Sequence, residues 1–268
     1  MDRDHIVIPG GRQRVLVLQS HRRPLPWPWL EDCLSSVRGW ARQWGFDYRF
    51  LDDDLFAPLP ADIRRATRDR PVVASDLARL LVMQQALAEG YQTAIWLDAD
   101  TLIVDPRRLL LPEDDYAVGR EVWVQRHGRG FRAWVKVHNA CLMFRAENPL
   151  LAFYIDAAAR LLRRHRGPMV PQLLGPKLLT ALHNIVGFPV MEEAAMLSPA
   201  VVADLLADGG AALSLFRRRS TAAPASVNLC GSLVASGELT PRAVEETIAL
   251  LRAQPDLLAP GTGSAAPA

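Results

Sequence analysis

Apolar and polar positions along the first hundred residues follow two alternating periods. Three short apolar runs end in polar or acidic residues, which predicts buried strands. The runs are residues 14–19 (RVLVLQ), 46–51 (FDYRFL) and 93–97 (TAIWL). Apolar residues also recur every three or four positions over 29–44, which predicts an amphipathic helix. A second helix is predicted over 75–89, with Ser75 or Asp76 as its N-terminal cap.

Strands that alternate with helices of this length favour a mainly parallel sheet covered by helices on both faces. The later half is less regular, and no internal repeat is visible. It predicts strands at 117–125 and 135–144, helices at 150–165, 177–186 and 242–253, and a loop at 167–176. We therefore expect one α/β/α sandwich domain over 14–253, after an N-terminal segment 1–13. The small-residue and proline-rich end, 254–268, is expected to be a disordered tail.

Composition excludes several classes of protein. With 50% hydrophobic residues, the 268-residue chain can bury enough apolar surface to fold, so a disordered chain is excluded. A net charge of +2 gives no field that favours nucleic acid as a partner. The cysteines, Cys33, Cys141 and Cys230, lack metal or disulfide spacing, which favours a reducing compartment. The first twenty residues lack a secretory signal, so we expect a cytoplasmic protein with at most peripheral membrane association.

Two carboxylates follow the third predicted strand directly. Asp98 and Asp100 are placed at the C-terminal edge of the parallel sheet, where such folds bind ligands. In an extended backbone residues two apart point to one side, so both could bind a hard divalent cation, with Ala99 leaving room for a ligand. Mg²⁺ or Mn²⁺ held in this way can bind both phosphates of a nucleoside diphosphate and stabilise the departing diphosphate. That is the chemistry of glycosyl transfer from a nucleotide sugar.

Residues 74–106 resemble the DxD region of GT-A-fold glycosyltransferases, in particular the bacterial capsule and lipopolysaccharide type. In that group a helix with an SD..R pattern precedes the DxD strand, and here the matching residues are Ser75, Asp76 and Arg79. The resemblance implies a GT-A-like (Rossmann-like) fold. It also implies that Asp76 and Arg79 line the nucleotide-sugar pocket, and that the DxD carboxylates bind metal and ribose.

Two later segments are similar to the same group. Residues 138–141 (HNAC) resemble the strand that brings an asparagine, here Asn139, to the donor or acceptor sugar. Gly175 and Pro176, with Thr180, resemble a later turn of the family. The four matching segments occur in the family's order, and together they cover about residues 14 to 235.

The chain departs from the family near its C-terminus. Many relatives supply a histidine there as third metal ligand, whereas residues 226–232 read SVNLCGS, so that Asn228 is the candidate oxygen donor. Gln19 and Ser20 end the first strand, where the nucleotide base rests in such folds. The expected catalytic residues are Asp100 and Asn139, and the expected metal ligands are Asp98, Asp100 and Asn228. The expected nucleotide-sugar pocket comprises Gln19, Ser20, Ser75, Asp76, Arg79, Asp98, Ala99, Gly175 and Pro176.

The resemblance implies transfer of a sugar, with a UDP-sugar as expected donor, to a hydroxyl of a glycan or lipid-linked acceptor. It favours retention of configuration, whereas inversion would need a base such as Asp156, Glu192 or Glu193. Two alternatives stay open. Asp98 and Asp100 also resemble the nucleophile and the general acid of haloacid-dehalogenase-type phosphatases. A relative that binds nucleotide or glycan without turnover would fit the missing histidine.

Overall fold

The computed structural model describes residues 14–165, 167, 170 and 172–261, and the expected N-terminal segment 1–13 lies outside them. A six-stranded sheet runs through the molecule in the order β2-β1-β3-β6-β5-β7. Its strands are β1 (Val15–Ser20), β2 (Asp47–Leu51), β3 (Thr93–Leu97), β5 (Tyr116–His127), β6 (Gly130–Arg145) and β7 (Val190–Met191). Strand β6 runs antiparallel to both of its neighbours, and the other pairs are parallel. The expected α/β fold with a mainly parallel sheet is confirmed.

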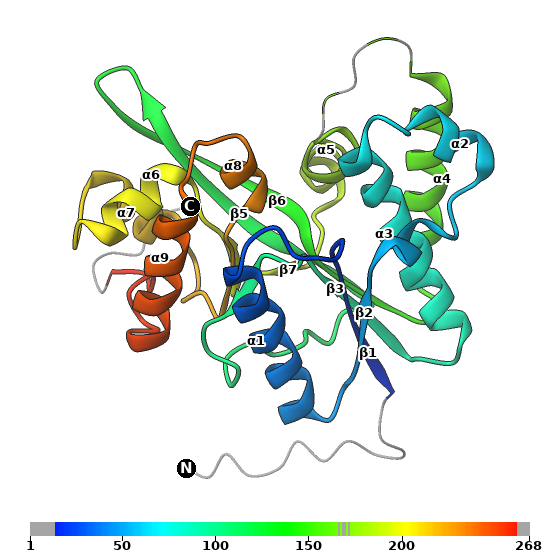
Figure 1. Ribbon diagram of the computed structural model, residues 1–268, viewed down its shortest axis with the longest axis horizontal. Helices are drawn as coiled ribbons and strands as arrows, with labels where there is room; N and C mark the ends of the chain where they lie inside the picture. Colours follow the sequence, from blue (N-terminus) through cyan, green and yellow to red (C-terminus); the bar gives the residue numbers. More distant parts are fainter. Residues whose placement is uncertain (1–13, 166, 168–169, 171, 262–268) are drawn as a thin grey trace.

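Both faces of this sheet are buried, because apolar residues in its central strands alternate between two cores. Leu16 and Leu18 of β1 pack with α3 (Pro71–Ala88) and α4 (Pro149–Arg164). Val15 and Val17 pack on the opposite face against α1 (Trp29–Trp44). Figure 1 shows α3 and α4 on one side of the sheet and α1 on the other. Most of the helices and strands predicted from periodicity are therefore present.

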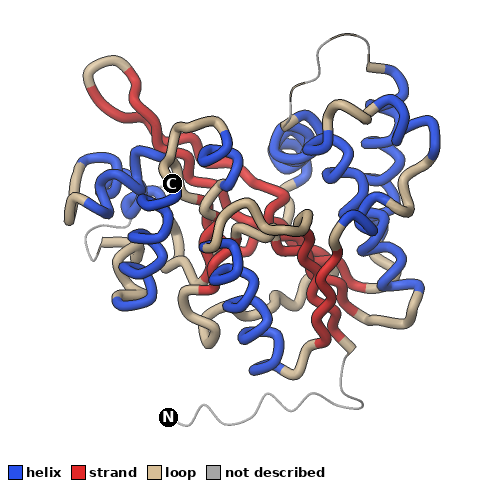
Figure 2. Tube along the Cα trace, in the orientation of Figure 1, coloured by secondary structure: helices blue, strands red, loops and turns tan. Residues whose placement is uncertain are grey.

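A second, smaller sheet, not predicted from the sequence, has the strand order β4-β9-β8. Its strands are β4 (Thr101–Ile103), β9 (Ser226–Asn228) and β8 (Ala194–Met196). A third core joins it to α6 (Pro199–Leu206), α7 (Ala211–Arg219), α8 (Gly231–Ala235) and α9 (Pro241–Ala253). Figure 2 shows these helices gathered at one end of the molecule, away from α3 and α4. The molecule thus has two halves that meet at the end of β3. The N-terminal half contains β1 to β3, α1 and α3, and the C-terminal half contains the small sheet and α6 to α9.

Several predicted boundaries are wrong. Helix α3 begins at Pro71, so Ser75 and Asp76 lie inside it and do not cap it. The predicted loop before α5 (Leu178–Val186) contains a π-helical turn, η2 (Leu173–Lys177). Leu258 is buried in the third core, so residues 254–261 do not form a disordered tail, whereas 262–268 lie outside the described residues.

Two short helical elements lie between β2 and α3 in the chain. They are η1 (Asp53–Phe56) and α2 (Ala61–Ala66).

In the part of the chain that the structure describes, no single helix is long and apolar enough to span a membrane. The pair α6 and α7 reaches that length and composition only when taken together, and it is bent by 116°.

Candidate active site at the end of strand β3

The segment Asp98-Ala99-Asp100 is a turn that joins the two sheets. It follows β3 of the large sheet and leads directly into β4 of the small one. The Thr101 amide donates to the Asp98 carbonyl (3.0 Å), which closes the turn, and the Leu229 amide donates to the Asp100 carbonyl (2.9 Å). The expected extended backbone at Asp98–Asp100 is therefore wrong, because the chain turns here to change sheets.

Both carboxylates nevertheless line one cavity of about 590 Å³, which we call the acid cavity. Its walls come from the end of β1, the start of α1, η1, α3, the β3–β4 turn and α8. Six of the predicted site residues line it: Ser20, Ser75, Arg79, Asp98, Ala99 and Asp100. Residues that the sequence reasoning did not select also line it, among them His21, Arg22, Trp27, Asp52, Asp53, Gly231 and Ser232. Residues distant in sequence thus form one concave site, in which a mainly apolar wall carries a few charged and polar groups.

Asp98 is held by residues of the N-terminal half. Its Oδ1 atom accepts hydrogen bonds from Arg79 Nη1 (2.8 Å) and Trp96 Nε1 (2.6 Å). The Arg79 guanidinium lies over the Trp96 ring, 5.1 Å from its centroid, so the two donors also contact each other through a cation–π interaction. Among the described residues, none donates a hydrogen bond to Oδ2 of Asp98, whose side chain is 28% exposed. One carboxylate oxygen is fixed, and the other is left for a ligand.

Arg79 stands between two acids and is itself buried. Its Nη1 also donates to the Asn139 carbonyl (2.9 Å), and Nη2 lies 3.3 Å from Oδ1 of Asp76. Burial alone lowers the pKa of Arg79, but the charges of Asp98 and Asp76 outweigh it and raise the pKa. Burial raises the pKa of Asp76 to about 6, against the opposing effects of Arg79 and Asn139. The guanidinium therefore stays charged beside Asp98.

Asp100 is held by residues of the C-terminal half. Its Oδ1 atom accepts from Asn228 Nδ2 (2.5 Å), and Oδ2 accepts from the backbone amide of Gly231 (2.6 Å). The preceding residue, Cys230, has a positive φ of 51°, which turns the chain so that the Gly231 amide faces the carboxylate. Burial and then the charge of Asp98 raise the pKa of Asp100.

Several predicted binding residues lie behind the cavity and position others. Gln19 is fully buried, and its Nε2 donates to the Asp98 carbonyl (3.1 Å), so it fixes the turn. Asn139, expected to touch the sugar, donates from Nδ2 to Asp76 (2.8 Å). A Cβ at Gly175 would lie 2.6 Å from the Asn139 amide, so glycine permits the close approach of η2. Pro176 belongs to that same turn and does not line the cavity among the described residues.

The geometry does not support Asn228 as a metal ligand. Its amide oxygen accepts from the backbone amide of Cys230 (2.9 Å), while its nitrogen donates to Asp100. Both ends of the amide are thus used inside the protein. Asn228 positions Asp100 and does not present an oxygen to the cavity.

Comparison with known proteins gave structural matches only. No family model matches the sequence, and no curated protein matches it. A crystal structure of a glycosyltransferase involved in the glycosylation of the major capsid of PBCV-1 aligns with a TM-score of 0.46 and 10% identity, covering 88% of this chain and 99% of that one. The apo form of mouse xyloside xylosyltransferase 1 aligns with a TM-score of 0.46 and 14% identity, covering 81% and 98%. Because both similarities are loose, the functional argument rests on the site itself.

The donor set of the acid cavity fits a divalent cation that takes most of its ligands from substrate and water. Within the described ranges, no group of three or more His, Cys, Asp or Glu side chains is arranged to hold a metal ion. Asp98 and Asp100, however, line the same cavity, and one oxygen of Asp98 has no hydrogen-bond donor among the residues that the structure describes. Mg²⁺ is commonly bound by one or two carboxylates together with substrate phosphates. The pair therefore fits such an ion only when a substrate supplies further oxygens.

Two important contacts were missed by sequence reasoning. Trp96 of β3, two residues before Asp98, was interpreted only as part of an apolar run, although its indole donates to the Asp98 carboxylate. The Gly231 amide contacts Asp100 across 131 residues of sequence, and a backbone donor has no side-chain signature. Asp76 and Arg79, which the resemblance placed in the pocket, form an i, i+3 ion pair, and of the two only Arg79 lines the acid cavity among the described residues.

Proposed function

We propose that the protein is a glycosyltransferase that moves a sugar from a nucleotide sugar, with a UDP-sugar as the expected donor, to a hydroxyl of a glycan or lipid-linked acceptor in the cytoplasm. In this reaction the bond between the anomeric carbon and the diphosphate oxygen breaks. A bond from that carbon to the acceptor oxygen forms, and the hydroxyl proton is released. The protein must therefore bind a diphosphate and keep the acceptor beside the anomeric carbon.

One observation carries the proposal. Two carboxylates, Asp98 and Asp100, line a single cavity at the C-terminal end of a central strand, and separate groups fix each of them. Two like charges that share one partly enclosed cavity repel each other, which is costly unless a ligand or cation uses them. Binding a metal–diphosphate complex is a function that accounts for this cost.

Asp98 and Asp100 would hold Mn²⁺ or Mg²⁺, which when bound would neutralise negative charge on the departing diphosphate. Arg79 keeps Oδ1 of Asp98 in place and leaves Oδ2 available. Asn228 and the Gly231 amide fix the orientation of Asp100. Ser20 and Ser75 add hydroxyls to the same cavity, where they are able to bind the nucleotide.

The structure points to other residues as the general base that an inverting reaction would need. Asp156 is exposed on α4 and pairs with Arg160 (2.8 Å), and Glu192 pairs with Arg120 (2.6 Å). Asp52 and Asp53 instead line the acid cavity. If the reaction inverts configuration, these two acids are the candidates to accept the hydroxyl proton.

The test is calorimetric titration of UDP and GDP with and without Mn²⁺, followed by hydrolysis and transfer assays with UDP- and GDP-sugars. Wild-type protein should bind a nucleoside diphosphate more tightly with Mn²⁺, and Asp98→Asn should lose that metal-dependent gain. Asp156→Asn, which changes an exposed acid away from the cavity, serves as the matched control. Cleavage of p-nitrophenyl phosphate without nucleotide binding would favour the phosphatase alternative, and metal-dependent binding without turnover would favour the non-catalytic one.

A further inference from the structure

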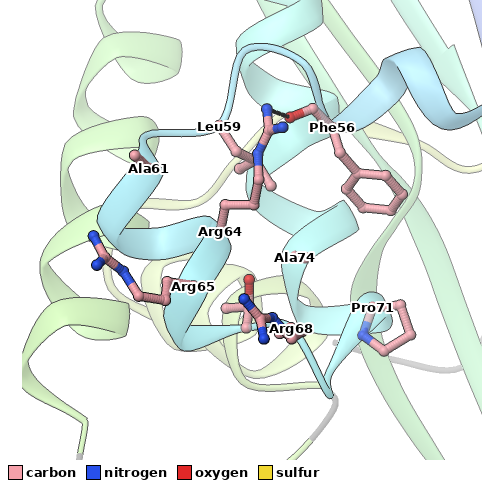
Figure 3. Close-up of a pocket in the computed structure, with 9 residues that line it drawn as sticks. Phe56, Leu59, Ala61, Arg64, Arg65, Arg68, Pro71 and Ala74 are labelled. Carbon is pink, nitrogen blue, oxygen red and sulfur yellow. Dashed lines mark hydrogen bonds between the residues drawn. The ribbon is translucent and has the colours of Figure 1, made fainter.

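A second cavity of about 750 Å³ lies beside the acid cavity, between η1, α2 and the start of α3 (Figure 3). Three arginines line it, Arg64, Arg65 and Arg68, and we call it the arginine cavity. Among the described residues, no acidic side chain lines it. Its volume is that of a pocket for a small organic ligand. The cavity therefore has both the size and the charge to bind an anion.

The arginines differ in how they are held. Arg64 is fixed by hydrogen bonds from its Nη2 to the carbonyl oxygens of Phe56 (2.6 Å) and Ala57 (2.9 Å), and Figure 3 shows the first of these. Both bonds use the same nitrogen, so other N–H groups of this guanidinium stay available. Arg65 and Arg68 form no hydrogen bond or ion pair with any residue that the structure describes. The nearby acid Asp62 is paired with Arg163 (2.7 Å) and does not neutralise them.

The remaining wall is mostly apolar, and its one hydroxyl among the described lining residues, that of Thr67, donates to the Ile63 carbonyl (2.8 Å). Phe56, Leu59, Pro71 and Ala74 line the cavity, and Leu59 and Ala74 are buried. A fully hydrated inorganic ion would gain nothing from such a wall, whereas an apolar group attached to an anion would be removed from water there. The three arginines are exposed and point in different directions in Figure 3, so they place positive charge around the rim of the cavity. A phosphate gains more from such a rim than a single carboxylate does, because it carries more charge and more acceptor oxygens.

The two cavities adjoin. Phe56 and Pro71 line both of them, and α3 presents Ala74 to the arginine cavity and Ser75 and Arg79 to the acid cavity. A molecule anchored in the arginine cavity can therefore extend past Phe56 toward Asp98. This is the arrangement required of an acceptor that must bring a hydroxyl to a donor sugar.

We propose that the arginine cavity binds the phosphate group of the acceptor, a phosphate that carries an apolar substituent lying on Phe56 and Leu59. The role as acceptor site rests on the proposed glycosyl transfer, whereas the binding itself does not. The same chemistry occurs in a soluble phosphate ester and in a lipid headgroup.

The test is calorimetric titration of octyl phosphate below its micelle concentration, compared with inorganic phosphate and octyl glucoside. Wild-type protein should bind octyl phosphate more tightly than either comparison ligand, and more weakly at high salt. The double variant Arg65→Gln/Arg68→Gln should lose about tenfold or more in affinity, because charge-assisted hydrogen bonds to phosphate are lost. The matched control is Arg218→Gln/Arg219→Gln, which removes the same charge from exposed positions on α7 and should change affinity less than about twofold.

Further arms separate the sources and the two proposals. Binding to vesicles containing phosphatidic acid, but not to phosphatidylcholine alone, assigns a lipid headgroup, and octyl phosphate binding without vesicle binding assigns a soluble ester. UDP should bind to the wild type and to both double variants with the same affinity. If UDP fails to bind even to the wild type, the result counts only against the proposed transferase. Octyl phosphate that does not bind, that binds the Arg65/Arg68 variant unchanged, or that is displaced by UDP would overturn the assignment of this cavity.

Discussion

The two carboxylates of the β3–β4 turn are two residues apart, yet opposite halves of the molecule hold them by different means. Asp98 is bound by a buried cation and an indole of the N-terminal half, and one of its oxygens stays available. Asp100 is bound on both oxygens by a neutral amide and a backbone amide of the C-terminal half. The difference indicates that the first half sets the charge of the site and the second half sets its geometry. Three experiments test this division, and a fourth tests the contact between the two sheets.

Replacing Arg79 should have the largest effect on stability. Arg79→Met leaves the buried Asp76 and the partly exposed Asp98 without their shared cation, which costs about 3–5 kcal/mol of the free energy of unfolding. Urea denaturation measures this loss. Arg218→Met, at an exposed position on α7, should change the free energy by less than ~0.5 kcal/mol. Equal losses in the two variants would remove the charge-setting role of the N-terminal half.

Asp98→Asn should separate function from stability. The amide keeps the size of the side chain and can still accept from Trp96 and Arg79, but it loses the negative charge. Metal-dependent turnover of the nucleotide sugar should fall by more than about a hundredfold, since even groups behind a metal ligand contribute up to that much. The melting temperature should change little. Turnover within a few-fold of wild type would show that Asp98 does not bind the metal.

On the C-terminal side, substitution should cost stability as well as activity. Asp100→Ala leaves the Gly231 amide and the Asn228 side chain without their acceptor, which costs about 1–3 kcal/mol. Its position at a sheet edge alone predicts little loss, and the two contacts reverse that expectation. Asp100→Asn restores an acceptor oxygen for one of the two donors and should recover part of the stability without activity. Chemical denaturation of both variants, compared with transfer assays, tests whether geometry and charge separate here.

The contact between the two sheets should depend on pH through His138. This buried residue of β6 has Nε2 3.0 Å from the Ala194 carbonyl of β8, and its Nδ1 accepts from the Ala140 amide (3.1 Å). Burial lowers the pKa of His138 to about 4, so the unfolded chain binds more protons between about pH 6.5 and 4. The free energy of unfolding should fall as pH decreases through that window, by at most ~1.4 kcal/mol per pH unit.

The variant His138→Gln provides the comparison for this pH effect. Its amide can donate to Ala194 and accept from Ala140, but it does not titrate. Urea midpoints measured from pH 4.5 to 7 should therefore depend less steeply on pH in His138→Gln than in wild type. Parallel pH profiles would show that His138 does not carry the acid sensitivity.

Sequence reasoning succeeded in the N-terminal half because its signals are periodic or local. The alternation of Val15 and Val17 with Leu16 and Leu18 identifies a strand that is buried on both faces. The SD..R pattern selected Asp76 and Arg79 as pocket residues, and the structure places Arg79 at the acid cavity and pairs it with Asp76. One boundary in this half was nevertheless wrong. Helix α3 begins at Pro71, so Asp76 lies inside the helix, where it is buried and accepts a hydrogen bond from Asn139.

In the C-terminal half the helix over 242–253 was predicted and is present as α9, but the small sheet was missed because its signals are short and distant. Strands β4, β8 and β9 have three residues each, too few to show a period of two. The partners of Asp100 lie 128 and 131 residues away, and one of them is a backbone amide. The direction of the Asn228 amide depends on Cys230, whose left-handed backbone conformation is unusual for a residue other than glycine.

The β3–β4 turn carries both acids, and hydrogen bonds join each acid to a different sheet: Asp98 to Trp96 of β3, and Asp100 to Asn228 of β9. Any sliding of the small sheet against the large one must therefore change the separation of the two carboxyl groups. A pair of reporters on α3 and α8 would register such sliding as a distance. That distance would report whether the two carboxyl groups are placed to bind one cation together.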